Sequence, residues 1–344
     1  MTREEAVRFL AEATVFRLAG ALDDGTPILK SLHGVVVDGW LCFHSAPKGE
    51  KTSLLGRPVV GCAEEDVARL PSYAFDAERA CPATTLFRSV QVHGVLQELS
   101  EPALKARALQ GLMEKLQPEG WHVPITETDP LYRPQVRGLL IAGVSLERLE
   151  GKAKLAQNRS AEDRRHLLEF LWQRGASTDA RSIELIREAN PGLSAPFLSA
   201  PEGFLLHAWL PPSRADEAAG LLVDAYWNGA YSREELRLAH LGSSAWVGIT
   251  DAGGTLVATA RALADGSKFA WIYDVAVAPE VQRRALGQAM MRLLLDHPVV
   301  RRCRRVMLGT RDAQTLYARF GFIPTSEAPK RPFQTTDMVL LRDR

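Results

Sequence analysis

The chain has 344 residues, of which 46% are hydrophobic and 24% charged, and its formal net charge is +1. This length favours two domains that each bury a core, and the composition excludes a disordered, collagen-like or disulfide-stapled chain. The near-neutral charge gives no general attraction to nucleic acids or acidic membranes, so we expect neither as a partner.

Apolar stretches such as residues 138–144 are far shorter than the ~20 residues of a membrane helix. Glu4 and Glu5 interrupt any signal-peptide pattern, so we expect a cytoplasmic protein. The cysteines are scattered, without disulfide or metal-ligand spacing. We therefore expect buried free thiols and no metal site at the four positions, Cys42, Cys62, Cys81 and Cys303.

The first part of the chain is dominated by short strands, predicted at residues 16–22, 27–37, 40–44, 59–64, 89–98 and 137–149. Asp24-Gly25 and Asp38-Gly39 predict tight hairpin turns, because glycine accepts the positive φ that such turns need. Helices are predicted at 2–13, where Thr2 and Glu5 form a capping box, and at 102–116. The pattern indicates an antiparallel barrel or sandwich.

The periodicity then changes to that of amphipathic helices, predicted at residues 160–174 and 178–189. Residues 190–201 contain three prolines and no charge, which is typical of a linker. We therefore expect a first domain at 1–175, a helix and proline-rich linker at 176–201, and a second domain at 202–344.

Strands and helices are mixed beyond the linker, which predicts an α/β sheet covered on both faces. The expected strands are 204–210, 245–250, 256–264, 270–278, 305–309 and 336–341. The expected helices are 215–228, 233–242, 284–296 and 312–320.

A short turn between the strand that ends at Pro279 and the following helix is a candidate anion site. The first N–H groups of a helix are unpaired and the helix dipole is positive there, as pyrophosphate binding requires. An ordinary strand-turn-helix connection is the alternative. Clustered arginines favour an anionic ligand or form a solvated face, and they include Arg301, Arg302, Arg304 and Arg305.

Together with the later run Leu316-Tyr317-Ala-Arg-Phe-Gly-Phe322, this segment resembles the GNAT acetyltransferase superfamily. The resemblance implies a GNAT fold, acetyl-CoA as co-substrate and a small-molecule amine as acceptor. It implies that the pyrophosphate is held by Gln282, Arg283, Arg284, Ala285, Leu286, Gly287 and Gln288, and that the pantetheine arm pairs with Val275, Ala276 and Val277.

Tyr317 would protonate the departing thiolate, and Asp274 or Glu280 would help remove the amine proton. A core aromatic is the alternative for Tyr317, and a solvated strand-end charge for the two carboxylates. Ala285 replaces a glycine of the family pattern and Arg283 a position that is often glycine. We expect right-handed backbone angles at Ala285, so that its methyl group is tolerated.

A second candidate anion site lies in the first domain, in the loop after a predicted strand that ends at His44 and Ser45. Lys48, Lys51 and Thr52 follow, and together they supply the ammonium, hydroxyl and backbone donors that a phosphate needs. Arg88 and Ser89 begin another strand and would converge on the same anion. An exposed basic loop is the alternative.

These segments, with residues 151–159, resemble the FMN-binding split barrels of the pyridoxamine 5′-phosphate oxidase-like superfamily, nearest the nitroimidazole-resistance type. The resemblance implies a homodimer with FMN at its interface. His44, Ser45, Lys51, Arg88 and Ser89 would come from one subunit, and Gln157 and Asn158 from the other. Haem ligated by His44 is the alternative, because some split barrels bind haem.

The two resemblances together imply a bifunctional protein, with an FMN-dependent oxidoreductase-like barrel followed by an N-acetyltransferase. The alternative is a flavin- or haem-binding sensor that regulates a degenerate acetyltransferase domain without turnover.

Overall fold

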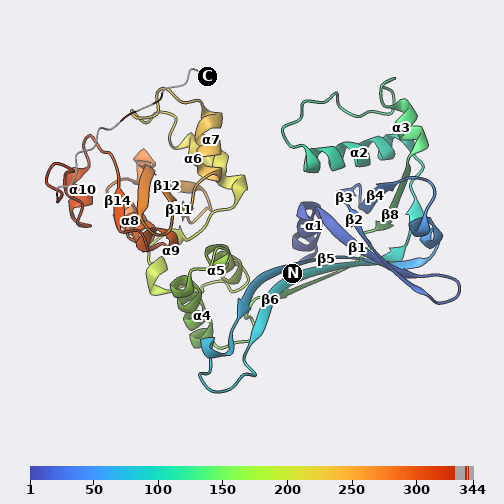
Figure 1. The fold of residues 1–344 in the computed structure, drawn as a ribbon, viewed down its shortest axis with the longest axis horizontal. Coiled ribbons are helices and arrows are strands. Elements are labelled where there is room, and N and C mark those ends of the chain that lie inside the picture. The colour runs from blue at the N-terminus through green and yellow to red at the C-terminus, as the bar shows by residue number, and fades with distance from the viewer. Residues whose placement is uncertain (330–337, 339, 341–344) are drawn as a thin grey trace. The chain divides into compact units, whose positions relative to one another are not determined.

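The computed structural model describes residues 1–329, 338 and 340, so the strand expected at 336–341 falls outside the described ranges but for two residues. The chain divides into two compact units (Figure 1). Unit 1 comprises Met1–Phe170 and Leu185–Leu193, and unit 2 comprises Leu171–Glu184 and Ser194–Arg344. Among the described residues, no helix combines the length and apolar character needed to cross a membrane.

Unit 1 is an antiparallel, split-barrel-like body of two sheets. One sheet has the order β2 (Pro27–His33), β1 (Val15–Ala21), β5 (Pro58–Leu70), β6 (Thr84–Val95) and β9 (Arg148–Lys154). The other has the order β3 (Val35–Val37), β4 (Trp40–Ser45), β8 (Leu140–Ser145) and β7 (Gln97–Glu98). The helices are α1 (Arg3–Glu12), α2 (Pro102–Leu116), α3 (Arg133–Gly138), α4 (Ala161–Arg174) and α5 (Asp179–Glu188), the last two shared with unit 2.

The capping box and the hairpin turns of unit 1 are confirmed. The Thr2 hydroxyl accepts from the backbone N–H of Glu5, whose carboxylate accepts from the N–H of Thr2. Gly25 and Gly39 have φ angles of 83° and 81°, at the turns that join β1 to β2 and β3 to β4. Local chemistry is sufficient for these features because each involves residues within three positions of one another.

Two predicted strands of unit 1 are broken in the structure. The run 27–37 divides at Gly34, where β2 of one sheet ends and β3 of the other begins. A Cβ atom at Gly34 would lie 2.3 Å from the ring of Phe16, so the crossing needs a residue without a side chain. The run 137–149 is the end of α3, then β8, a turn and the start of β9.

The main core of unit 1 lies between the two sheets and α1, and it includes Leu18, Phe43, Leu54 and Val90. A second cluster lies beneath α2, where Leu104 and Leu112 pack with Val35 and Ile141. These side chains are at most 8% exposed.

Unit 2 contains one mixed sheet, as expected for the GNAT fold. Its order is β10 (Phe204–His207), β11 (Ala245–Asp251), β12 (Leu256–Ala264), β13 (Phe269–Val277) and β14 (Arg305–Met307). All neighbours are antiparallel except β13 and β14, which are parallel. Its remaining α-helices are α6 (Ala215–Gly220), α7 (Arg233–Leu241), α8 (Leu286–Asp296), α9 (Pro298–Arg301) and α10 (Gln314–Ala318).

The helix predicted at 215–228 is only six residues long. It ends at Gly220, and residues 221–231 form turns whose aromatic side chains Tyr226, Trp227 and Tyr231 remain more than 40% exposed. The apolar periodicity alone therefore overestimated this helix, because its second half lines a cavity rather than packing against the sheet.

The end of α4 is bound into unit 2 through Trp172, which is 1% exposed. Its ring stacks on Phe197 with centroids 4.7 Å apart, meets His297 edge-on, and donates from Nε1 to Asp296 Oδ2 at 2.5 Å. Arg301 donates to the carbonyls of residues 172 and 173, and Arg302 to that of residue 174.

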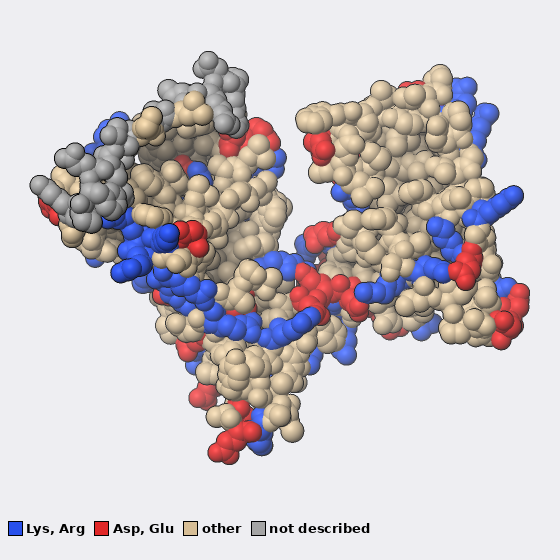
Figure 2. Space-filling view, viewed as in Figure 1, with Lys and Arg blue, Asp and Glu red and all other residues tan. Residues whose placement is uncertain are grey.

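These contacts give two of the clustered arginines a structural role. Arg301 and Arg302 satisfy carbonyls at the end of a helix, where the dipole is negative and cations are stabilising. Blue side chains gather in a band over the region of α8 and α9 (Figure 2). The sequence pattern did not predict these contacts of Arg301 and Arg302 with the carbonyls at the end of α4.

His297 gives unit 2 a specific pH dependence. Burial, with the charge of Arg301, lowers the pKa of His297 from 6.5 to about 4. Between pH 6.5 and 4, His297 is protonated in the unfolded chain but stays neutral in the folded chain. We therefore expect the free energy of unfolding to fall by roughly 3 kcal/mol across this range. Chemical denaturation across this range measures the effect. His297→Asn keeps a capping side chain for Val299, and an unchanged pH profile in this variant would contradict the assignment.

Candidate functional site

A cavity of about 1610 Å³ opens in unit 2 where β13 and β14 stop pairing. The parallel register runs only from Phe269–Arg305 to Trp271–Met307, whereas β13 continues to Val277. Among the described residues, no strand pairs with β13 beyond Trp271 on the side of β14, although its other edge stays paired with β12. This free half of β13 forms one wall of the cavity, and residues 308–313 after β14 form another. The turns at 226–231, the side of α7 and Tyr317 complete the lining.

Asp274 lies at a β-bulge in the middle of β13. Arg261 pairs with Tyr273 and Thr259 with Ala276, so one residue of β12 faces two residues of β13 at this point. Asp274 has a positive φ of 53°, which is rare for a residue with a side chain. A bulge bends its strand and redirects its side chains, and here it does so beside the cavity.

Asp274 is buried and held by three side-chain donors. Arg261 Nε donates to Oδ2 at 2.6 Å, and Trp227 Nε1 and Asn228 Nδ2 donate to Oδ1 at 3.1 and 3.4 Å. The prediction of a solvated strand-end charge is therefore wrong for Asp274, whose residue is 7% exposed. The hydrogen bonds of this carboxylate hold Arg261 and the turn at 227–228 in place in the absence of a ligand.

Tyr317 stands on α10 and lines the same cavity. It is 8% exposed, and its ring meets Phe322 edge-on at 6.0 Å. Burial raises the pKa of Tyr317, and the neighbouring Tyr226 and Asp312 raise it further. A raised pKa keeps the phenol protonated, which is the form that a proton donor needs.

The turn before α8 differs from our expectation. Arg283 and Ala285 have φ angles of 61° and 59°, so both are left-handed. The expectation of right-handed angles at Ala285 is wrong, and the usual glycines at these positions have a physical reason, since a side chain there costs roughly 1–2 kcal/mol. The fold retains this strained turn between η5 (Pro279–Val281) and α8.

The start of α8 provides uncapped backbone donors. Ala285 is the N-cap residue, and no side chain in the described part of the chain forms a capping hydrogen bond there. The Gln282 side chain donates to the carbonyl of Val277 at 3.1 Å, so it ties the turn to the end of β13. A Cβ atom at Gly287 would meet Val277 only at 3.9 Å, which is ordinary contact.

The other predicted acetyl-CoA residues lie along this segment. Val275, Ala276 and Val277 are half-buried at the end of β13, and Gln288 is half-buried in the first turn of α8. The Arg284 guanidinium lies 6.0 Å from the centre of the Phe204 ring. The end of β13, the turn and the start of α8 thus follow one another in the order that the sequence predicts.

The candidate residues of unit 1 fall on both of its sheets. His44 is the last residue but one of β4, before the loop that leads to Lys51 and Thr52 in η1 (Glu50–Leu54). Partial burial, with the charges of Lys51 and His33, lowers the pKa of His44. The Ser45 hydroxyl donates to the carbonyl of Ala46 and that of Thr52 to the carbonyl of Gly49, while Lys48 is exposed.

Arg88 and Ser89 lie on β6, in the other sheet. Arg88 donates twice to Glu65 Oε2, at 2.6 and 3.0 Å, and stacks over Phe9 at 5.0 Å. Gln157 closes its own turn by bonding Ala153 and Leu155, and Asn158 is exposed beside it. Arg88 thus contacts Glu65 and Phe9, whereas Lys51 influences His44 through its charge.

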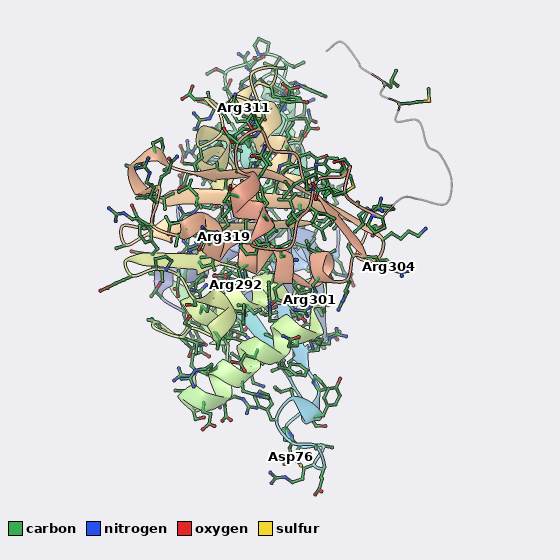
Figure 3. All side chains as sticks on the ribbon, turned by 90° about the vertical axis from the view of Figure 1, so that its left-hand side faces the viewer. Asp76, Arg292, Arg301, Arg304, Arg311 and Arg319 are labelled. Atoms are coloured by element: carbon green, nitrogen blue, oxygen red, sulfur yellow. The ribbon has the colours of Figure 1, made fainter. Side chains whose placement is uncertain are left out.

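The sequence interpretation missed several residues of the cavity. Arg261 was an isolated charge in an otherwise apolar strand, which is a signal for a buried partner. Trp271 and Tyr273 alternate on β13, and their spacing in the sequence predicts only a strand. Of the clustered arginines, Arg311 lines the cavity, and Figure 3 shows it well apart from Arg301 and Arg304.

The domains match two known families. The family model described as pyridoxamine 5′-phosphate oxidase matches residues 2–153, and that described as acetyltransferase (GNAT) family matches residues 208–322. A search of curated proteins gave no match.

Solved structures resemble each half of the chain. A putative GNAT acetyltransferase from Xanthomonas campestris is 28% identical, covering 39% of this chain and 96% of its own, with a TM-score of 0.33. A putative 5-nitroimidazole antibiotic resistance protein from Bacteroides thetaiotaomicron is 15% identical, covering 44% of this chain and 82% of its own, with a TM-score of 0.35. The FAD and heme binding protein from Mycobacterium smegmatis is 13% identical, with coverages of 44% and 71% and a TM-score of 0.36.

The chain thus carries an N-terminal pyridoxamine 5′-phosphate oxidase-like domain and a C-terminal GNAT acetyltransferase domain. Both assignments agree with the fold predicted from the sequence.

The left-handed angle at Ala285 predicts a stabilising substitution. Ala285→Gly removes the steric cost of the Cβ atom and adds a smaller entropic cost, so we expect the free energy of unfolding to rise by about 0.5–1 kcal/mol. Ala289→Gly, one turn along α8, should lower it by about 1 kcal/mol or more. Chemical denaturation of both variants measures the difference, and destabilisation by Ala285→Gly would contradict the assigned backbone angle.

Proposed function

We propose that the C-terminal domain transfers the acetyl group of acetyl-CoA to an amine by direct attack. The observation that supports this most is the position of Tyr317, a buried phenol on the cavity that opens beside the free half of β13. The free half of β13 lines the same cavity up to Val275, and the start of α8 follows β13 in the chain after a short turn.

The turn and helix start at 282–288 would bind acetyl-CoA. Their backbone N–H groups would hold the pyrophosphate, because they converge on one point and the helix dipole is positive there. Val275, Ala276 and Val277 would pair with the pantetheine arm. The clustering of these residues at the end of β13 would place the thioester at the cavity.

The chemistry is an acyl transfer within this geometry. The amine nitrogen attacks the thioester carbonyl, the new C–N bond forms, and the C–S bond breaks. Backbone N–H groups of β13 near Val275 would stabilise the developing oxyanion, Tyr317 would donate its proton to the departing thiolate, and the amine proton would pass to solvent. Asp274 would act through Arg261, Trp227 and Asn228, by holding this wall in place.

Removal of the Tyr317 hydroxyl group tests whether Tyr317 is the proton donor. Tyr317→Phe keeps the ring against Phe322 and removes only the hydroxyl, so we expect kcat to fall by ~10²- to 10⁴-fold with acetyl-CoA affinity nearly unchanged. Release of free CoA in an amine screen measures kcat, and calorimetry measures affinity. Turnover unaffected by the substitution would remove Tyr317 from this role, and absent acetyl-CoA binding would indicate a degenerate domain.

For the N-terminal domain we propose FMN binding in a homodimer. The strand end with His44 and Ser45 and the short helix η1 with Lys51 and Thr52 are joined by a four-residue loop, which supports a phosphate site at the end of β4. Arg88, Ser89, Gln157 and Asn158 would contact the remainder of the flavin, the last two from the second subunit. Bound FMN would supply redox chemistry, while the protein residues would bind and orient it.

Native mass spectrometry of the full chain reports the subunit number and the bound cofactor together. We expect a dimer with two FMN molecules, because an isologous interface forms both sites at once. Lys51→Ala removes a charge-assisted contact of ~1.5–3 kcal/mol and should weaken FMN affinity about tenfold or more. Lys268→Ala, an exposed lysine of the other domain, should leave it unchanged. A monomer that retains FMN, or a haem spectrum, would contradict the proposal.

A further inference from the structure

We propose that the acceptor in the cavity of unit 2 is a primary amine with a flat aromatic body and no carboxylate. The inference rests on the proposed acetyl transfer and names the class of amine. It is carried by the side chains that line the cavity and by the way their charges are already paired.

The cavity has two aromatic walls. Trp271 and Tyr273 stand side by side on β13, with their rings stacked at 23° and centroids 5.9 Å apart. Tyr226 and Trp227 pack edge-to-face at 4.8 Å in the opposite turn, where Tyr231 follows. These rings are 37–59% exposed although the core of the domain is nearby. Exposed aromatic faces grouped around a hollow are typical of a site that binds a flat, apolar ligand.

The charged groups on the cavity already have partners. Arg261 is paired with Asp274, and the Arg311 guanidinium stacks 3.6 Å from the centre of the Tyr226 ring while it contacts Asp312 at 3.3 Å. Glu235 accepts hydrogen bonds from Ser232 in the capping box of α7.

The balance of these charges disfavours an acidic acceptor. Among the described residues that line the cavity, three have a carboxylate, Glu235, Asp274 and Asp312, and two have a guanidinium group, Arg261 and Arg311. A substrate carboxylate would therefore displace an existing ion pair and enter an environment with an acidic excess. A protonated amine, in contrast, is attracted both by the carboxylates and by the ring faces before it loses its proton.

The aromatic walls also lead to the reacting groups. Tyr273 is followed directly by Asp274 and Val275, and Tyr317 lines the same cavity. An amine whose body lies on Trp271 and Tyr273 thus extends its nitrogen toward the free half of β13. A small polar amine would leave these rings in water and lose the binding energy they offer.

A set of matched amines tests the substrate class. Tryptamine carries the aromatic body alone, tryptophan adds a carboxylate, and spermidine has amines without an aromatic group. We expect kcat/KM for tryptamine to exceed that for the other two by at least about tenfold. Equal or higher kcat/KM for tryptophan or spermidine would overturn the inference and leave acetyl transfer standing.

Two aromatic residues on the same face of β13 provide a variant and its control. Trp271→Ala should raise KM for tryptamine by about tenfold and change kcat by less than about threefold, because the ring binds the amine and takes no part in proton transfer. Phe269→Ala removes an exposed ring two residues earlier, outside the cavity lining, and should change neither constant. Equal effects of the two substitutions would overturn the inference.

Calorimetry separates the failure of this inference from the failure of the proposed function. Titration with acetyl-CoA tests the latter alone. Titration with tryptamine in the presence of CoA tests the amine site without turnover, and we expect binding that Trp271→Ala weakens about tenfold. Tryptamine that fails to bind, or binds equally to the variant, would show that the inference is wrong whatever the first titration gives.

Discussion

The buried ion pair between Arg261 and Asp274 is the constraint on which the candidate acceptor site depends. Burying two charges is costly, and the cost is offset only where geometry and additional hydrogen bonds satisfy both groups. Here the carboxylate is also bonded to Trp227 and Asn228, so one interaction joins two sheet strands to the turn across the cavity. The bulge and the left-handed backbone of Asp274 persist because this network fixes them.

The same part of the fold contains two more strained residues, Arg283 and Ala285. Each accepts a left-handed backbone without being glycine, and together they turn the chain from the end of β13 into α8. Strain of this kind is maintained where surrounding structure determines the backbone, and it concentrates at functional sites. In this domain it lies on both sides of Val275–Val277, the segment proposed to meet the acetyl-CoA arm.

The N-terminal domain distributes its candidate ligands differently. His44 and Lys51 lie beside a strand of one sheet, whereas Arg88 and Ser89 belong to the other and Arg88 is engaged by Glu65. A flavin is long enough to span such separated groups, since its phosphate, ribityl chain and ring system need different environments. In the proposed homodimer, a phosphate anchor in one sheet would be combined with further contacts from the other sheet and from the second subunit.

The sequence by itself determined the features that depend on near neighbours. The capping box of Thr2 and Glu5, the Asp-Gly hairpins and the continuous segment from Val275 to Gln288 could all be predicted, because each depends on residues close together in the chain. The two domain families could also be identified from such local motifs.

Only the tertiary structure decided which groups meet from distant segments. Gly34 breaks a strand because of the ring of Phe16, Asp274 is buried because Arg261 and Trp227 reach it, and Arg301 caps a helix that ends 127 positions earlier in the chain. Left-handed angles at Arg283 and Ala285 likewise arise where the surrounding fold overrides the local preference of the residue. Such contacts carry no periodic signal in the sequence, because the free energy that stabilises them comes from packing and charge pairing in three dimensions.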